Sequence, residues 1–413
     1  MSASVRLGAG RHMEVRPIPD TAVSTLHELT TADGAKVSGV LRMMPGARTI
    51  VCLMHPRQDF THHVLVPELL SRGVAVWTQG SRSVNNDLNL LHEQAVLDMA
   101  AGQVFLRSGG FEHVVTLGHS GGGPLAALYH QQAGLPPGQR LSRTPAGRPV
   151  DLASAEMPLP DGAVFMAPHL GQGALLKRLI DPSVTDETDP LSRDPELDPY
   201  NPENGFAHAP ANSSYSAEYV ERYRAAQQAR IARIDDHARE LAADATAARN
   251  RFKHSGVVDD RRQALAPSII TVYRTDADLR SVDRSLDPNE RPYGSLFGSR
   301  PDLINYGLLG FGRLSTPEAW LSTWSATSTH ADFLRCAPGM NVATLLIELT
   351  GDQAAFPGDA LAMMEAFGSA DKTHERVRGL HFGGPLAPGE PAGSSLAGDV
   401  LGAWLAERFP VAV

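Results

Sequence analysis

The stretch VVTLGHSGGGPL, residues 114–125, decides the fold of this chain. It starts with apolar, β-branched residues typical of a buried strand, and it ends where we expect a helix over residues 125–132. Gly118, Ser120 and Gly122 fill a G-x-S-x-G pattern at the turn between the two. Such a turn holds a serine hydroxyl at the top of a sheet, where the flanking positions have no room for side chains. The stretch predicts a nucleophilic serine, and the alternative is a glycine-rich turn without chemistry.

Strands and helices alternate on both sides of this turn, which predicts an α/β fold with a doubly wound, mostly parallel sheet. The expected strands are residues 25–31, 36–43, 49–54, 74–77, 163–169, 343–349 and 375–380. The expected helices are residues 64–71, 89–107, 358–367 and 395–408. The run at 49–54 is apolar throughout, as expected for a strand that is covered on both faces.

The regular alternation breaks after residue 170. Residues 181–212 contain repeated Asp-Pro and Asn-Pro pairs, which favour extended, loop-like chain. The carboxylates there lack the spacing of a calcium-binding loop, so we expect a solvated loop. A strand-like run at 268–274 fits either an insertion or an extension of the main sheet.

One long helix is expected over residues 217–252, with Ser216 as its N-cap and Gly256 closing it. Its apolar stripe is thin, so we expect most of the helix to be exposed. The stripe fits half of a homodimer contact, although a lid helix packed on one side needs fewer assumptions.

Two later strands run into residues that would suit catalysis. The strand at 343–349 leads into Gly351-Asp352, and the last strand leads into a loop that holds His381. Because open α/β sheets gather their ligands at the carboxyl ends of the strands, both residues are expected near Ser120. The alternatives left open for the acid are Glu348, Asp276, Asp278 and Asp359, and the rival histidine is His374, which precedes the last strand.

With a serine, an acid and a histidine in this order, the chain resembles the α/β-hydrolase superfamily, in particular its capped, serine esterase-like branch. The resemblance covers about residues 25–170 and 315–413. It implies that residues 171–314 form a large, largely helical cap inserted after the sixth core strand, and that residues 1–24 are an N-terminal extension. Ser120 would be the nucleophile, His381 the general base, and Asp352 the acid that orients the imidazole.

An oxyanion hole is the remaining requirement of that chemistry. One donor is expected to be the backbone N–H of Gly121. In the superfamily a His-Gly pair often stands where His55-Pro56 stands here, and a proline has no N–H to offer. The second donor is therefore expected at Arg57, with Gln58 as the alternative, through the backbone or the side chain. His55 itself is expected to be structural.

A substrate pocket is expected beside the resumed core, where aromatic residues accumulate. Its candidate lining residues are His119, Tyr306, Phe311, Trp320 and Trp324. The alternative for the aromatic residues is plain packing between the cap and the core.

These residues predict a serine hydrolase that cleaves a carboxylic ester or thioester through an acyl-enzyme on Ser120. The elbow chemistry alone does not separate this reaction from amide, lactone or carbon–carbon bond hydrolysis, because cap and pocket select the substrate. A hydrolase-fold binding protein whose site has lapsed is the alternative from another class.

The composition and the motifs of the chain limit which partners and cofactors we expect. A formal charge of -9 over 413 residues, with no basic run interleaved with aromatics, argues against nucleic-acid binding. With neither a signal-peptide core nor about 18 consecutive apolar residues, we expect a cytoplasmic enzyme off the membrane, acting on a small ester-type substrate. Metal-ligand spacings and dinucleotide loops are also missing, so no cofactor is expected. Cys52 and Cys336 form no disulfide framework.

Overall fold

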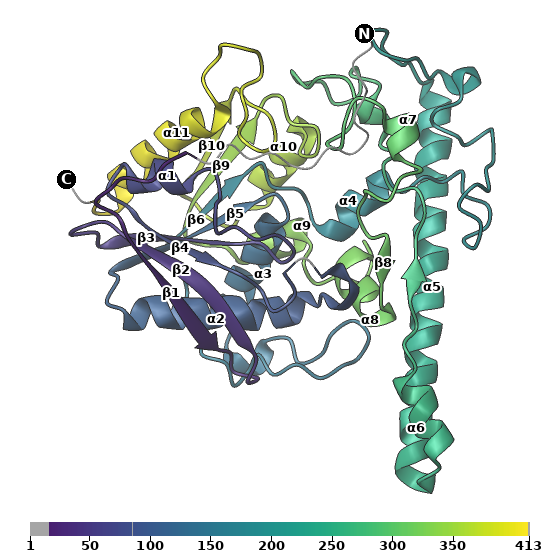
Figure 1. Cartoon of the computed structure of the whole chain (residues 1–413), viewed down its shortest axis with the longest axis horizontal. Helices are drawn as coiled ribbons and strands as arrows, with labels where there is room; N and C mark the ends of the chain where they lie inside the picture. The colour runs from purple at the N-terminus through teal and green to yellow at the C-terminus, as the bar shows by residue number, and fades with distance from the viewer. Residues whose placement is uncertain (1–15, 85, 412–413) are drawn as a thin grey trace.

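An eight-stranded sheet forms the centre of the computed structural model, which describes residues 16–84 and 86–411 (Figure 1). The strands are β1 Val23–Thr30, β2 Lys36–Met43, β3 Thr49–Met54, β4 Ala75–Gln79, β5 His113–His119, β6 Gly162–Met166, β9 Ala343–Leu349 and β10 Lys372–Val377. Their spatial order is β1-β2-β4-β3-β5-β6-β9-β10. Only the pairs β1–β2 and β2–β4 are antiparallel. The sheet is doubly wound around β3, which confirms the predicted fold class.

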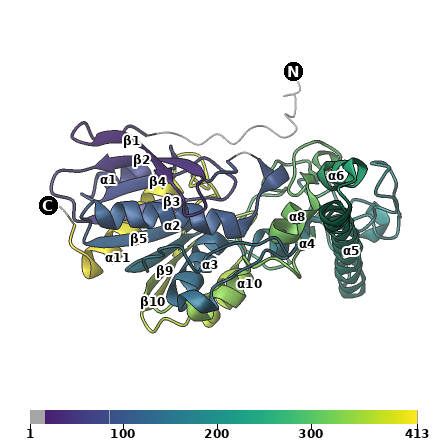
Figure 2. The same ribbon diagram turned by 90° about the horizontal axis from the view of Figure 1, so that it is seen from below.

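Helices cover both faces of this sheet (Figure 2). The core helices are α1 Val66–Leu70, α2 His92–Ser108, α3 Gly122–Gly134, α10 Pro357–Ala366 and α11 Gly393–Arg408, with the short turns η1 Asp87–Asn89 and η2 Pro137–Gln139. Apolar side chains of α1 and α11 cluster on one face, and those of α2, α3 and α10 on the other. In β3, Val51 and Leu53 join the first cluster while Met54 joins the second, so the strand is buried on both faces, as its apolar run indicates.

Between β6 and β9 the chain leaves the sheet and builds a second, largely helical body (Figures 1 and 2). Its elements are α4 Gln172–Leu179, η3 Pro202–Asn204, α5 Ala217–Ser255, α6 Val258–Leu265, β7 Ile270–Thr271, η4 Leu279–Ser281, α7 Pro301–Ile304, β8 Leu314–Ser315, α8 Pro317–Ala319 and the π-helical turn η5 Trp320–Trp324. Helix α9 Phe333–Cys336 and the turn η6 Ala337–Gly339 lead back to β9. The strand-like run at 268–274 supplies only β7, which pairs with β8, so it belongs to this insertion and not to the main sheet.

Helix α5 has the expected ends. The Ser216 hydroxyl accepts a hydrogen bond from the Tyr219 N–H at 3.1 Å, and Gly256 ends the helix in the left-handed region at φ 69°. The helix extends three residues beyond the predicted end at 252. Its far end and α6 project away from the rest of the molecule (Figure 1).

Buried polar side chains hold the insertion together where the apolar stripe of α5 is thin. Asp235 of α5, which is 1% exposed, accepts hydrogen bonds from Trp320 Nε1 at 2.7 Å, from Ser325 Oγ at 2.7 Å and from Thr327 Oγ1 at 2.6 Å. The η5 turn is tied to the core in the same way, because Ser322 Oγ donates to the buried Glu93 of α2 at 2.7 Å. Hydrogen-bonded polar groups therefore add to the apolar contacts of Ile231, Ile234 and Ala238 at this junction.

Candidate active site

The turn after β5 places Ser120 in a strained conformation. Its φ is 54°, in the left-handed region, and its N–H donates to the Met166 carbonyl of β6 at 3.2 Å. A Cβ on Gly118 would lie 2.7 Å from both the Gly122 carbonyl oxygen and the Gly123 Cα. The glycines of the G-x-S-x-G pattern are therefore needed for close packing of backbone on backbone, as at a nucleophile elbow.

Three residues from the ends of three strands form a chain of hydrogen bonds. Ser120 Oγ donates to His381 Nε2 at 3.1 Å, and His381 Nδ1 donates to Asp352 Oδ2 at 2.7 Å. The other oxygen of Asp352 accepts the N–H groups of Ala354 at 2.6 Å and Ala355 at 3.0 Å. His381 and Asp352 are buried, while Ser120 is partly exposed. The arrangement has the nucleophile, base and orienting acid geometry of a catalytic triad.

The rival candidates take part in other contacts. Glu348 accepts from His374 Nε2 at 3.1 Å and from Arg376 Nε at 3.0 Å, between β9 and β10. The other three acids lie in or against the insertion. Ser295 Oγ donates to Asp276 at 2.7 Å, and burial raises the pKa of Asp276 to about 7.

Two buried histidines support the loop that carries His381. Because His63 Nδ1 accepts the Leu65 N–H at 3.2 Å, its proton lies on Nε2, which donates to His119 Nδ1 at 2.8 Å. His119 Nε2 in turn donates to the backbone carbonyl of His381 at 2.9 Å. Burial lowers the pKa of His63 to about 3, which keeps His63 neutral. His119, expected in the pocket, thus lies where it fixes the backbone of His381.

The loop after β3 differs from the expected oxyanion hole. The N–H groups of Arg57 and Gln58 both donate to His55 Nδ1, at 3.0 and 2.9 Å. Both amides, which were the expected second donors, therefore already have an acceptor within the protein. Among the described residues, no group accepts a hydrogen bond from the N–H of Gly121.

Side-chain nitrogens converge instead on Gly121. A Cβ built there would lie 2.6 Å from Gln172 Nε2, 2.8 Å from His55 Nε2 and 3.2 Å from His169 Nε2. His169 Nδ1 accepts the Gly171 N–H at 3.1 Å, so its proton is on Nε2. Burial lowers the pKa of His169 to about 3, and the neighbouring His381 and Arg57 act in the same direction. The sequence analysis did not single out His169 as a candidate, although it ends a predicted core strand just as the other candidates do.

The Arg57 side chain and two of the predicted pocket aromatics meet at the boundary between core and insertion. The Arg57 guanidinium pairs with Asp87 and lies 4.7 Å from the ring centre of Trp324 and 5.2 Å from that of Phe311. This contact fits packing between cap and core, which was the alternative for these aromatics.

The remaining predicted pocket residues lie within the insertion. Trp320 is fully buried and donates to Asp235, as described above. Tyr306 is 43% exposed, and Arg274 Nη1 donates to its hydroxyl at 3.1 Å. The structure therefore does not bring Trp320 and Tyr306 to the serine.

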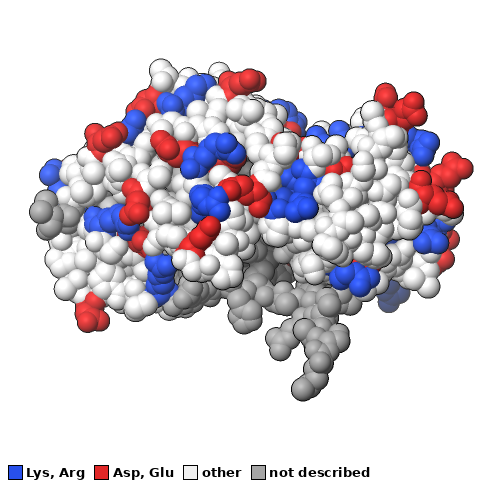
Figure 3. All heavy atoms as spheres, turned by 90° about the horizontal axis from the view of Figure 1, so that it is seen from above, with Lys and Arg blue, Asp and Glu red and all other residues white. Residues whose placement is uncertain are grey.

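Acidic and basic side chains intermingle on the molecular face seen in Figure 3. Within residues 16–84 and 86–411, no helix combines the length and apolar character needed to cross a bilayer. The same residues contain no cluster of three or more His, Cys, Asp or Glu that could hold a metal ion. Both cysteines are buried and unpaired with each other.

Comparison with solved structures supports the fold. DcsB, solved in complex with its substrate analogue, has a TM-score of 0.50 at 12% identity, covering 94% of this chain and 100% of that one. The esterase domain of a Rhodothermus marinus protein scores 0.44 at 11% identity, covering 93% and 98%. The α/β hydrolase GrgF from Penicillium sp. sh18 scores 0.46 at 12% identity, covering 93% and 96%. No family model and no curated protein sequence matches the chain. At these identities the likeness concerns the fold alone, and the chain has the α/β-hydrolase fold.

Proposed function

We propose that the protein is a serine hydrolase that cleaves a carboxylic ester or thioester through an acyl-enzyme on Ser120. The single observation that carries this proposal is the hydrogen-bonded chain from Asp352 through His381 to the strained Ser120. A serine hydroxyl is a weak nucleophile at neutral pH, so a neutral imidazole within hydrogen-bond distance is the feature that activates it.

In the proposed reaction, His381 Nε2 takes the Ser120 proton as Oγ attacks the carbonyl carbon, and then returns that proton to the leaving oxygen or sulfur. Asp352 stabilises the imidazolium and keeps the ring in the required tautomer. Water then attacks the acyl-enzyme with His381 again as base, which releases the acid and restores Ser120.

The backbone N–H of Gly121 is the first oxyanion donor in this proposal, and His169 Nε2–H is the second. His169 is a neutral donor with its proton fixed on the correct nitrogen, beside Gly121. His169→Ala should lower kcat by about 10²-fold, the usual cost of losing one oxyanion donor, with little change in KM. An unchanged kcat would return the role to the loop after β3.

The first test is the intact mass of the protein after treatment with a fluorophosphonate, with peptide mapping of any adduct. A single stoichiometric adduct on Ser120, lost in Ser120→Ala, is the expected result. A folded protein that forms no adduct would instead be a hydrolase-fold binding protein with a lapsed site.

The acid is tested separately with two matched variants. Asp352→Asn should lower kcat for an aryl ester by about 10³-fold or more, since the imidazole loses its orienting partner. Glu348→Gln is the control, because Glu348 lies against His374 instead. A loss of rate in the control but not in Asp352→Asn would move the acid role to Glu348. Turnover of vinylogous diketones, with little turnover of aryl esters, would favour the carbon–carbon hydrolase alternative.

A further inference from the structure

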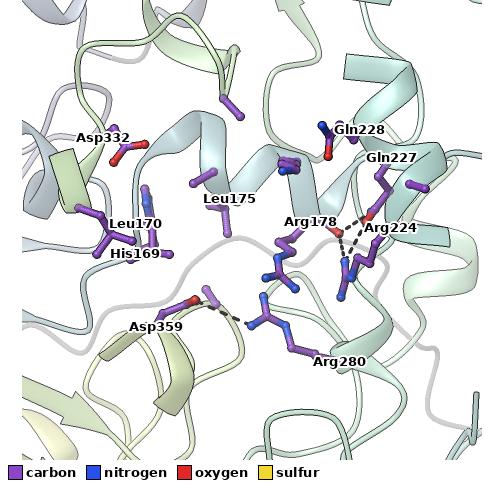
Figure 4. A pocket seen from close by; sticks show the side chains of 16 residues that line it. His169, Leu170, Leu175, Arg178, Arg224, Gln227, Gln228, Arg280, Asp332 and Asp359 are labelled. Carbon is purple, nitrogen blue, oxygen red and sulfur yellow. Dashed lines mark hydrogen bonds and ion pairs between the residues drawn. The ribbon is translucent and has the colours of Figure 1, made fainter. Parts of the chain in front are cut away.

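A cavity of about 440 Å³ lies between the core and the insertion (Figure 4). Helices α4 and α5 and the turn η4 form its walls on the insertion side, and residues of the α9 and α10 regions close it on the core side. Its volume suits a small-molecule ligand or part of one.

Two residues that line this cavity lie beside the proposed catalytic site. His169 lines the cavity, and its Nε2 lies 3.2 Å from the Cβ position of Gly121, the residue after the nucleophile. Ala354 also lines it and donates to the carboxylate of Asp352. Ser120 itself does not line the cavity, so His169 and Ala354 are the residues through which the cavity adjoins the proposed site.

Three arginines from three different elements point into the cavity. Arg280 of η4 binds both oxygens of Asp278, and Arg224 of α5 donates to the same carboxylate at 3.2 Å. Asp359 lies 3.8 Å from Arg280. Figure 4 shows Arg178 of α4 and Arg280 approaching each other from opposite walls. Asp278 therefore fixes two of the three guanidinium groups in place.

Arg178 is the exception in this group. Among the described residues, no carboxylate lies within 4.0 Å of its guanidinium and no acceptor receives a hydrogen bond from it. Arg178 is exposed to solvent and also lines the cavity. Burial lowers the pKa of Arg178, and the charges of Arg224 and Arg280 lower it further, while Asp278 and Asp359 act in the opposite direction. A cation crowded by two other cations gains from any anion that enters beside it.

We propose that this cavity binds an anionic arm of the substrate, with Arg178 as the pairing residue and Arg280 as its neighbour. The inference rests on the proposed function and gives it a substrate class, namely esters that carry a carboxylate or phosphate away from the scissile carbonyl. An arginine offers a planar fork of donors, which suits a carboxylate or phosphate oxygen pair.

The kinetic test compares two esters that differ only at the end of the acyl chain: mono-p-nitrophenyl adipate, which ends in a carboxylate, and p-nitrophenyl hexanoate, which ends in a methyl group. The wild-type protein should prefer the adipate by kcat/KM. Arg178→Gln should reduce that preference about tenfold or more, because a charge-assisted hydrogen bond is lost. Arg178→Lys, which keeps the charge, should restore part of it.

Arg233→Gln is the matched control, because Arg233 is an exposed arginine of α5 that does not line the cavity. It should leave the preference unchanged. A wild-type protein without preference for the adipate, or equal losses for both esters in Arg178→Gln, would overturn the inference.

Binding measurements on a variant that cannot turn over test the anion site separately from the proposed function. Titration calorimetry of adipate and of inorganic phosphate is carried out on Ser120→Ala and on Ser120→Ala/Arg178→Gln, neither of which needs to turn over. Saturable binding to the first and at least tenfold weaker binding to the second would support the anion site, even if no ester were cleaved. Whichever probe binds identifies the arm as a carboxylate or a phosphate. Absence of binding by both probes would overturn the anion site, even if both esters were cleaved.

Discussion

The sheet core and the insertion meet at one site, but they differ in the kinds of side chain that they bury. Strands β3 and β6 have every residue buried, mostly with aliphatic or aromatic side chains. The buried face of α5 instead includes Gln227, Arg230 and Asp235, each of which is hydrogen-bonded to the rest of the insertion. Apolar burial requires only a side chain of suitable size, whereas polar burial requires a specific partner.

This difference indicates which substitutions should most reduce the stability of each region. In the core, the positions most constrained should be those where backbone meets backbone around Ser120. In the insertion, they should be the polar side chains that satisfy several donors at once. The predictions below test this division, from the largest expected effect to the smallest.

Gly118→Ala should have the largest effect. Its Cβ would meet the Gly122 carbonyl oxygen and the Gly123 Cα at 2.7 Å, and backbone atoms cannot rotate away as a side chain can. We expect a loss of unfolding free energy of about 3 kcal/mol or more in urea denaturation, in the range of severe overpacking.

Gly110→Ala provides the matched control for that substitution. Gly110 has a φ of 86° but no atom within 4 Å of its Cβ position, so only the backbone penalty of about 1 kcal/mol applies. If the two variants were equally stable, the close packing at the elbow would not be a constraint.

The elbow also explains why so much of the core is predictable from sequence. The spacing of Gly118, Ser120 and Gly122 is that of one local turn. The apolar residues of the preceding strand predict that this strand is buried. The alternation of strands and helices predicts Asp352 and His381 near strand ends, whereas it does not predict the order of the strands in the sheet. The second oxyanion donor does not follow, because the hydrogen bonds of His55 Nδ1 depend on how one loop folds back on itself.

Asp235→Ala should have the next largest effect. The substitution leaves the N–H of Trp320 and the hydroxyls of Ser325 and Thr327 buried without their acceptor. We expect a loss of about 3 kcal/mol, measured by urea denaturation, because each unsatisfied buried group carries its own desolvation cost.

Asp236→Ala tests whether position on the same helix matters more than the contacts. Its side chain is 74% exposed, and among the described residues it pairs only with Arg239. The change should stay within about 0.5 kcal/mol. A loss comparable to that of Asp235→Ala would mean that the contacts of Asp235 do not account for the loss in that variant.

The sequence could not predict this anchoring. The thin apolar stripe of α5 correctly indicates few apolar contacts, yet it gives no information on which buried partners Gln227, Arg230 and Asp235 would find. Those partners lie 40 or more residues away along the chain. Trp320 and Phe311 were predicted to line a pocket for the same reason. The partner of Trp320 is Asp235 and a neighbour of Phe311 is Arg57, and the local sequence indicates neither.

Stability should depend on pH in opposite directions in the two regions. In the insertion, burial raises the pKa of Asp276 to about 7. Between about pH 4 and 7 the folded protein then keeps a proton that the unfolded chain releases, so this residue reduces stability as pH rises. In the core, burial lowers the pKa of His63 and His130 to about 3, so their contributions are lost as pH falls below about 6.5.

Asp276→Asn removes the pH dependence that comes from Asp276 and leaves the one that comes from His63 and His130. The difference in unfolding free energy between the variant and the wild type should change by about 1.4 kcal/mol per pH unit between pH 4 and 7, in favour of the variant at higher pH. Urea denaturation at pH 5, 6, 7 and 8 measures it. Parallel curves for the two proteins would show that Asp276 is ionised in the folded state at all these values.

A small effect is also expected where α5 and α6 project from the molecule. There Arg251 Nε donates to Asp260 Oδ1 at 2.8 Å, with the arginine side chain 50% exposed. An ion pair so open to water is worth at most about 1 kcal/mol, because solvent and salt screen it. Asp260→Asn should therefore shift the unfolding free energy by less than 1 kcal/mol, and the shift should shrink further in 1 M NaCl. A larger, salt-independent loss would mean that the projecting end of α5 is coupled to the anchored part near Asp235, and the division between buried and exposed polar contacts would no longer explain how the insertion is held.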